Sequence, residues 1–398
     1  MLSSARAKHP SSEAFSVSSP AESIEISVVM PCLNEAGSVG ICVEKALRAL
    51  AAMGASGEVV VVDNGSTDGS QEIAERAGAR VVREPRRGYG SAYLRGFAEA
   101  RGRYLVMGDS DDSYDFLDIA RFIAPLRAGK DLVMGTRLGG KILPGAMPWT
   151  HRWIGNPILS GMLKILFRTK ISDSHCGMRS FTREAYDRMH LRTTGMEFAS
   201  ELVVNALREQ LSIEEIPITY HPRIGESKLN GVRDAWRHVR FMLMFSPSYL
   251  FQLPGLILML LGGVLVAWLA AGPRELFGRT WDFHVLLLGA LALILGTNLV
   301  MFDVIAKTFS MGAGFARPGQ WLTKLPRWFS LEKGLLVGGL LFLIGLGTEI
   351  EIVAVWLTGG RGPLMAVRGI ALGMTAMVIG AQAIFASFLV SLMLIERR

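Results

Sequence analysis

Four aspartates stand close together in the segment MGDSDDSYDF, residues 107–116. Asp109 and Asp111 are two positions apart, so their carboxylates leave a strand on one side or converge in the turn after it. Two carboxylates at this spacing suit a hard divalent cation such as Mg²⁺ or Mn²⁺, which also binds substrate phosphates. A plain helix start is the other interpretation, because Asp112 and Asp115 precede a predicted helix whose dipole favours acids. The segment therefore predicts either a metal site or a helix N-terminus.

Another aspartate, Asp63, ends the apolar run VVVVD and is followed by Asn64 and Gly65, a pair that forms tight turns. Its carboxylate can accept hydrogen bonds from a nucleobase or ribose, or it can belong to the turn alone. The residues by themselves leave both interpretations open.

Short β-branched runs alternate with helical stretches from residue 23 onward. The pattern predicts strands at 26–30, 58–63, 79–83, 103–108 and 131–135, with helices near 38–53, 69–77, 90–100 and 116–128. Such an alternation indicates an α/β fold with a mostly parallel central sheet covered on both faces. Ligands of these sheets bind at the carboxyl ends of the strands, where the aspartate motifs fall. The first strand is not followed by Gly-x-Gly-x-x-Gly, which disfavours an ordinary dinucleotide fold.

Half of the 398 residues are hydrophobic, and most of that excess lies after residue 248. Apolar runs at 249–271, 283–302, 334–357 and 370–395 are each long enough for a helix to cross roughly 30 Å of hydrocarbon. Basic residues crowd the predicted loop at 303–333 and the last two positions, so the positive-inside rule places both termini in the cytoplasm. We therefore expect an integral protein of a bacterial cytoplasmic membrane.

Four parts are expected along the chain. They are a disordered tail at 1–22, a cytoplasmic domain at 23–230, a juxtamembrane amphipathic helix at 231–248 and an all-α transmembrane domain of about four helices at 249–398. Tryptophans and aliphatic residues alternate with basic residues between 141 and 170 as well, around Trp149 and Trp153. This mixture is typical of a helix that lies in the bilayer interface.

Five motifs follow one another in a fixed order: SVVMPCLNEAGSV, VVVVDNGSTDGS, EPRRGYGSAYLRGF, YLVMGDSDDSYDF and DLVMGTRL. In this order and spacing they closely resemble family 2 glycosyltransferases with the A-type nucleotide-sugar fold. The segments DSHCGMRSF, TTGMEFASELVVNA and RIGESKLNG look like the branch of dolichyl-phosphate mannose and polyprenyl-phosphate glucose synthases. The resemblance covers roughly residues 25–246, and the four predicted spans depart from what both kinds of synthase commonly carry.

The resemblance implies a donor site and a metal. It implies that the nucleotide is contacted by Pro31, Asn34, Glu35 and Asp63, and that Asp109 lies near the ribose or the sugar. Asp111 becomes the principal ligand of Mg²⁺ or Mn²⁺, with Asp109 beside it, and the metal bridges the donor diphosphate. Related enzymes often carry a Gln two residues after this aspartate to help hold the metal, and Ser113 stands there in this chain.

The resemblance also implies phosphate-binding cations. Arg137 and Arg152 match positions that hold the acceptor phosphate, and Arg223 and Lys228 match a loop that closes over the donor diphosphate. Glu197 and Glu201 share a helix face near the position where some family members place a general base. A lipid phosphate is already ionised at neutral pH, so we expect both glutamates to be structural or positioning groups.

Taken together, these implications predict inverting transfer of one sugar from a nucleotide-sugar donor to polyprenyl phosphate, with UDP-glucose ahead of GDP-mannose. Membrane lipid is the expected partner, nucleic acid is not, and a homo-oligomer is left open. One alternative is a processive polysaccharide synthase, although Gln320 and Arg327-Trp328 lie too far apart for its Gln-x-x-Arg-Trp motif. Another is a non-catalytic lipid-carrier translocator or scaffold, because Glu349 and Glu351 lie inside the third apolar run and intramembrane acids are costly and often functional.

Overall fold

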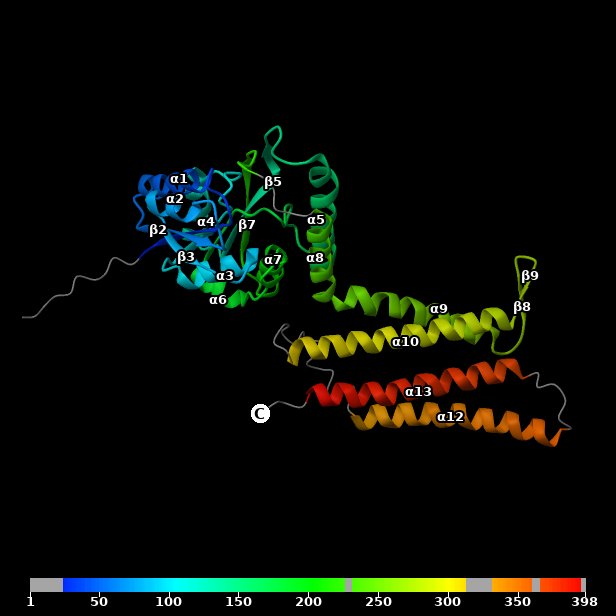
Figure 1. The fold of residues 1–398 in the computed structure, drawn as a ribbon. Helices are drawn as coiled ribbons and strands as arrows, with labels where there is room; N and C mark the ends of the chain where they lie inside the picture. Colours follow the sequence, from blue (N-terminus) through cyan, green and yellow to red (C-terminus); the bar gives the residue numbers. More distant parts are fainter. Residues whose placement is uncertain (1–23, 226–230, 313–330, 360–365, 395–398) are drawn as a thin grey trace, which may run out of the picture. The chain divides into compact units, whose positions relative to one another are not determined.

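A computed structural model describes residues 24–225, 231–312, 331–359 and 366–394. The predicted tail at 1–22 and Lys228 lie outside these ranges. The chain divides into two compact units, one up to Phe241 and one from Met242 onward. Each unit is described by itself below, and Figure 1 shows the elements of both.

The first unit is built on a seven-stranded sheet in the order β3-β2-β1-β4-β6-β5-β7. Its strands are β1 (Ile26–Cys32), β2 (Gly57–Asp63), β3 (Arg80–Arg83), β4 (Tyr104–Met107), β5 (Leu132–Ile142), β6 (Arg179–Thr182) and β7 (Ile213–Tyr220). Strands β3, β2, β1 and β4 are parallel neighbours, and β5 is parallel to β7. Strand β6 is antiparallel to both β4 and β5. The prediction of a mostly parallel α/β sheet is confirmed, and β6 and β7 are strands that it did not include.

Helices cover both faces of this sheet (Figure 1). The helices of this unit are α1 (Val39–Ala52), α2 (Ser70–Arg76), α3 (Tyr89–Glu99), α4 (Ile119–Arg127), α5 (Asn156–Phe167), α6 (Arg183–Met189), α7 (Phe198–Arg208) and α8 (Gly231–Met244). Of these, α5 and α8 stand beside the sheet and do not cover a face of it (Figure 1). On one face Val28 and Val61 pack in a buried cluster with Cys42 of α1 and Phe122 of α4. On the other face Gly96 of α3 lies so close to Val29 that a Cβ atom there would be 2.3 Å from its Cγ1. Alternate residues of each central strand therefore face opposite helical layers, as expected for a strand buried on both sides.

Three irregular elements complete the connections between helices. They are the short helix η1 (Phe116–Asp118), the π-helix η2 (His151–Gly155) before α5, and the π-helix η3 (Ser248–Gln252) after α8. The predicted interfacial segment around Trp149 and Trp153 thus forms η2 and α5. Arg233 and Trp236 of α8 are exposed, whereas His238 is buried, so this helix is amphipathic.

The second unit contains four helices that are long and apolar enough to cross a membrane. They are α9 (Leu253–Leu269), α10 (Phe283–Gly312), α12 (Leu331–Thr358) and α13 (Val367–Leu394), with a small hairpin of β8 (Arg274–Leu276) and β9 (Arg279–Trp281) between the first two. Glycines allow the helices to approach closely, because Gly338 and Gly345 of α12 lie against Gly380 and Gly373 of α13.

Both ends of the loop predicted at 303–333 are helical instead, because residues 303–312 continue α10 and residues 331–333 begin α12. The charges at the end of the apolar run do not stop the helix. Nζ of Lys307 lies 2.6 Å from Oδ2 of Asp303 one turn earlier, so the two charges offset each other within the helix.

Candidate active site

The carboxyl ends of three neighbouring strands meet at one edge of the first unit's sheet. Cys32 at the end of β1 pairs with Asp63 at the end of β2, and Met107 at the end of β4 pairs with Val29 of β1. The loops that follow these strands carry the predicted donor and metal residues. The parallel register therefore brings these loops to one place, which we call the carboxyl edge.

Asp111 is held in a fixed orientation at this edge. Ser113 donates from its hydroxyl at 2.5 Å and from its backbone N–H at 3.1 Å to Oδ1 of Asp111. The backbone carbonyl of Asp111 accepts from the N–H of Ile224 at 2.9 Å. Ser113, which stands at the position where related enzymes often carry Gln, thus orients the aspartate. Both of its hydrogen bonds engage Oδ1, and Oδ2 of Asp111 faces Arg223.

Arg223 joins this aspartate to the loop after β1. Its Nη2 lies 3.4 Å from Oδ2 of Asp111 and 3.2 Å from Oε1 of Glu35, in ion pairs with both carboxylates. The predicted donor residues Glu35, Asp111 and Arg223 therefore lie together, although they come from three distant segments of the chain. A guanidinium in this position can also bind phosphate oxygens through two N–H groups at once.

Asp109 lies deeper than Asp111 and faces aromatic hydroxyls. The hydroxyl of Tyr93 donates to its Oδ1 at 3.3 Å, and Tyr89 donates as well. Burial and, after it, the negative charge of Asp111 raise the pKa of Asp109 to about 7. Gly177 leaves room for this carboxylate, because a Cβ atom there would lie 2.8 Å from Oδ2 of Asp109 and would displace it.

The remaining two aspartates of the cluster have a separate cation. Nζ of Lys45 on α1 lies 2.7 Å from Asp112 and 3.9 Å from Asp115. Asp115 also caps η1 by accepting from the N–H of Leu117 at 3.1 Å. The helix-start interpretation thus applies to Asp115, while Asp112 pairs with Lys45. The metal interpretation of Asp109 and Asp111 stays a prediction.

The predicted nucleotide-binding residues Asp63 and Asn34 lie at the end of β2 and in the loop after β1. Asp63 is buried and accepts from the N–H groups of Gly65 and Ser66, at 3.1 and 3.0 Å, and from the amide of Gln71 at 2.8 Å. Asn34 has a positive φ of 53° and connects the two loops, because its Oδ1 accepts from the N–H of Thr67 at 2.8 Å. Asp63 therefore shapes the turn, and its contact with a nucleotide stays a prediction.

Pro31 links the first strand to the aspartate loop. Its carbonyl oxygen accepts from the hydroxyl of Ser110 at 2.6 Å, so the residue between Asp109 and Asp111 is fixed to β1. The backbone around Pro31 thereby holds the acid pair at the carboxyl edge.

Arg137, predicted to bind the acceptor phosphate, is buried in an ion pair that the sequence did not indicate. Its Nε and Nη2 donate to the two oxygens of Asp173, each at 2.8 Å, and its backbone N–H donates to the same carboxylate at 3.0 Å. The guanidinium also lies 5.3 Å from the ring centroid of Tyr220. Asp173 belongs to the motif DSHCGMRSF, which carries part of the family resemblance but does not by itself indicate this partner.

The other predicted acceptor residue, Arg152, lies apart from this pair. It is exposed on η2, where its guanidinium is 5.2 Å from the ring centroid of Trp153. Lys228 falls outside the described residues, so the structure gives it no position. The predicted donor residues thus gather at the carboxyl edge, whereas the predicted acceptor residues do not form one contact group within residues 24–225.

The acid pair fits a divalent cation of the hard type. Asp109 and Asp111 supply carboxylate oxygens, and burial together with the neighbouring charge of Asp111 raises the pKa of Asp109, so a cation here would favour its ionised form. Within the described ranges, three or more His, Cys, Asp or Glu side chains nowhere gather in a metal-binding arrangement. Mg²⁺ commonly takes one or two protein carboxylates and completes its shell with water and substrate phosphates, so two aspartates suffice.

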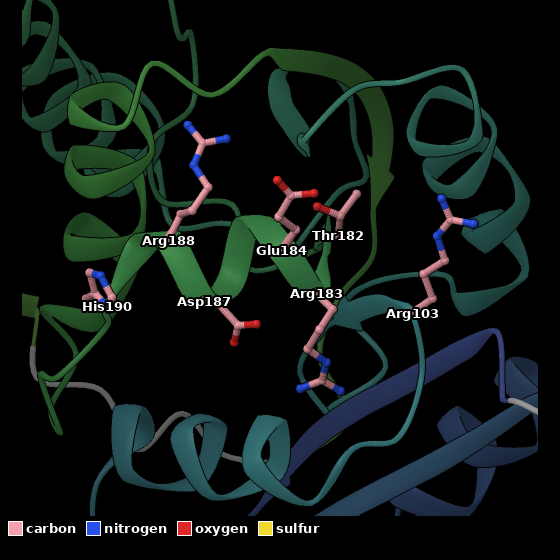
Figure 2. Close-up of a pocket in the computed structure, with 7 residues that line it drawn as sticks. All are labelled: Arg103, Thr182, Arg183, Glu184, Asp187, Arg188 and His190. Atoms are coloured by element: carbon pink, nitrogen blue, oxygen red, sulfur yellow. The ribbon is translucent and has the colours of Figure 1, made fainter.

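A separate pocket opens at the opposite end of β4 (Figure 2). It is lined by Arg103, Thr182, Arg183, Glu184, Asp187, Arg188 and His190. Its arginines are held by main-chain oxygens, since Arg183 donates to Phe97 at 2.8 Å and Arg188 to Glu209 at 2.6 Å. These cations secure α6 to the neighbouring segments, and the pocket lies away from the acid pair.

A mostly parallel sheet with an acid pair after its fourth strand, followed by four apolar helices, defines a membrane-attached glycosyltransferase. The family model "Glycosyl transferase family 2" matches residues 27–189, and "Glycosyltransferase family 2 C-terminal transmembrane region" matches residues 304–394. The chain belongs to glycosyl transferase family 2 and is an integral membrane protein. The predicted family and enzyme class are confirmed.

Similar proteins occur in archaea and bacteria. The chain is 42% identical to the low-salt glycan biosynthesis hexosyltransferase Agl6 of Haloferax volcanii, over 92% of this chain and 88% of that protein. It is 30% identical to the glycosyltransferase AglJ of the same organism, over 62% of this chain and 83% of that one. A solved glucosyl-3-phosphoglycerate synthase from Mycobacterium tuberculosis, in complex with Mn²⁺, UDP-glucose and phosphoglyceric acid, is 22% identical. It covers 55% of this chain and 78% of its own chain with a TM-score of 0.45.

Proposed function

We propose that this protein transfers a single hexose from a nucleotide-sugar to a polyprenyl phosphate, with inversion at the anomeric carbon. The observation that carries this proposal is the meeting of Asp109, Asp111, Glu35 and Arg223 at the carboxyl edge, in a chain whose described residues include four helices long and apolar enough to cross a membrane. The name of the relative Agl6 supports a hexose. We propose UDP-glucose as donor ahead of GDP-mannose.

On the donor side, the chain's own residues bind and orient the diphosphate. Asp109 and Asp111 would hold Mg²⁺ or Mn²⁺, which when bound supplies positive charge to the leaving diphosphate. Arg223, now paired with two carboxylates, can turn its remaining N–H groups toward phosphate oxygens. Asp63, Asn34 and the Pro31 segment form the wall against which the nucleotide would lie.

On the acceptor side, Arg137 would orient the lipid phosphate. A phosphate oxygen attacks the anomeric carbon, a new carbon–oxygen bond forms, and the bond to the donor diphosphate breaks on the opposite face. The attacking oxygen already carries negative charge, so a general base is not needed. The contacts of Glu201 agree with this, because its carboxylate accepts from the N–H groups of Arg192 and Thr193, at 3.0 and 2.8 Å, and so is engaged in holding the loop.

A lipid acceptor is supported by the apolar surface of the first unit. Four large apolar side chains on η2, on α5 and just before η2 are exposed. The exposed fractions are 67% for Trp149, 69% for Trp153, 55% for Ile158 and 65% for Ile165. Large apolar side chains beside basic residues are typical of elements that lie in a bilayer interface. We propose that this surface rests on the cytoplasmic leaflet and that both termini face the cytoplasm.

The test uses the full-length protein in lipid nanodiscs with undecaprenyl phosphate, Mg²⁺ or Mn²⁺, and a panel of labelled nucleotide-sugars. We expect one labelled sugar to pass into the organic phase as a monosaccharide-phosphate lipid, with loss of label in EDTA. A water-soluble polymer as the product would favour a processive synthase. Absence of lipid-linked label and of nucleoside diphosphate release with every donor would favour a translocator or scaffold and would reject the proposal.

A further inference from the structure

Three helices of the first unit and one connecting segment meet in a buried group of serines and histidines, apart from the acid pair. It consists of Ser160 on α5, Ser174 and His175 in the segment before β6, Ser200 on α7 and His238 on α8. Ser174 and Ser200 are completely buried, and Ser160 and His238 nearly so. We call these five residues the serine–histidine cluster.

Hydrogen bonds run through the cluster from one helix to the next. The hydroxyl of Ser200 lies 2.8 Å from Nδ1 of His238 and 3.5 Å from Nε2 of His175. The other ring nitrogen of His175 lies 2.8 Å from the hydroxyl of Ser174, which in turn is 3.2 Å from that of Ser160. The two imidazole rings meet edge to face with centroids 4.4 Å apart. The elements α5, α7 and α8 are thereby fastened to one short segment.

That short segment also holds Arg137. The backbone N–H of His175 donates to Oδ1 of Asp173 at 3.3 Å, and this same carboxylate oxygen accepts from Nη2 of Arg137 at 2.8 Å. A side chain of α8 is thus connected to the buried guanidinium through His175 and Asp173. Helix α8 precedes η3 and the first membrane span along the chain.

Both histidines are held in the neutral form. Burial lowers the pKa of His238 to about 4, although the charges of Asp234 and Glu197 act in the opposite direction. Burial, with the neighbouring His238, holds the pKa of His175 well below its usual range. The nearby cations Arg137, Arg179 and Arg237 also disfavour a second positive charge here, whereas Asp173 favours one. Neutral rings can each donate and accept, as this hydrogen-bond chain requires.

We propose that His238 is a positioning residue, through which the helix leading into the membrane holds Arg137 in the orientation that receives the acceptor phosphate. The contact with Ser200 fixes His238, the ring of His175 packs against it, and the backbone of His175 then orients Asp173. The part concerning acceptor phosphate rests on the function proposed above. The mechanical link between His238 and Arg137 does not depend on it.

The link is tested by hydrogen exchange on the full-length protein in nanodiscs, without substrate. We expect His238→Leu to accelerate exchange of the Arg137 and His175 amides, both of which donate to Asp173, by about tenfold, which lies within the range for a coupled network. His238→Asn keeps a polar group near the Nδ1 position and should stay near wild type. The matched control is His190→Asn, which replaces an exposed histidine at the C-cap of α6 with positive φ. Unchanged exchange at these two amides in His238→Leu would overturn the inference.

Kinetics then separate positioning from general damage. In His238→Leu the KM for polyprenyl phosphate should rise about tenfold while the KM for the nucleotide-sugar stays the same, and His238→Asn should restore the acceptor KM. An equal rise in both KM values would contradict a positioning role. If wild-type protein glycosylates no polyprenyl phosphate, the proposed function fails, and the exchange result alone decides whether His238 holds Arg137.

Discussion

Nζ of Lys45 lies 2.7 Å from Oδ1 of Asp112, and this contact divides the aspartate cluster into two pairs. Asp112 and Asp115 share the lysine, and Asp115 caps a short helix, while Asp111 pairs with Arg223 and Asp109 beside it accepts from Tyr93. A positively charged protein can therefore carry four neighbouring carboxylates because each pair meets its own cation.

The two adjacent aspartates should respond differently to the same substitution. Asp111→Asn removes the charge that faces the donor diphosphate, and we expect transfer to fall by about 10²–10³. Asp112→Asn removes only a partly exposed ion pair worth up to about 1 kcal/mol, and asparagine tolerates the left-handed φ of 58° at this position. Initial rates at saturating Mg²⁺ measure both variants. Equal losses in the two would mean that Asp111 has no special role.

Breaking the buried pair of Arg137 and Asp173 should destabilise the protein strongly. Asp173→Asn leaves a guanidinium buried without its counter-ion, which costs about 3–5 kcal/mol. Arg127→Gln, which breaks an exposed pair with Glu25, is the control and should cost less than about 1 kcal/mol. Thermal unfolding of the full-length protein in detergent compares them. A joint Arg137→Met and Asp173→Leu variant should regain stability and remain inactive; transfer by that variant would argue against Arg137 as the acceptor site.

Acid should destabilise the fold through His238. Its pKa is about 4 in the folded protein, below the ordinary value of 6.5, so the unfolded chain binds more protons between these pH values. Stability that is fully present above pH 6.5 is therefore lost progressively as the pH falls toward 4. The raised pKa of Asp109 acts with the opposite sign throughout this window, but it is common to wild type and His238→Asn. Melting temperatures from pH 7.5 to 4.5 should fall less steeply in His238→Asn; parallel curves would contradict this assignment.

The exposed tryptophans should matter only when the acceptor is embedded in a bilayer. Replacing Trp149 and Trp153 together with serine removes apolar area, and we expect about tenfold lower transfer to undecaprenyl phosphate in nanodiscs. Transfer to a short-chain prenyl phosphate in detergent should be unaffected. Leu117→Ser, an isolated exposed apolar residue of the same unit, is the control. Equal losses with both acceptors would argue for a packing defect instead of membrane contact.

The sequence by itself determined those features that depend on local order along the chain. Strand and helix periodicity predicted the parallel part of the sheet, the apolar runs predicted four spanning helices, and the ordered motifs predicted the family. The positions of Asp63, Asp109 and Asp111 at strand ends also followed, because parallel strands end at a common edge.

The tertiary structure decided which charged groups meet. Lys45 and Asp112 are 67 residues apart, Arg137 and Asp173 are 36 apart, and Ser200 and His238 are 38 apart. No local pattern marks such partners, because burial and crossing of elements create the contact only after folding. The position of the antiparallel strand β6 was likewise decided only by the tertiary structure. It lies between β4 and β5, and the segment before it brings Asp173 to Arg137 and His175 to His238 of α8.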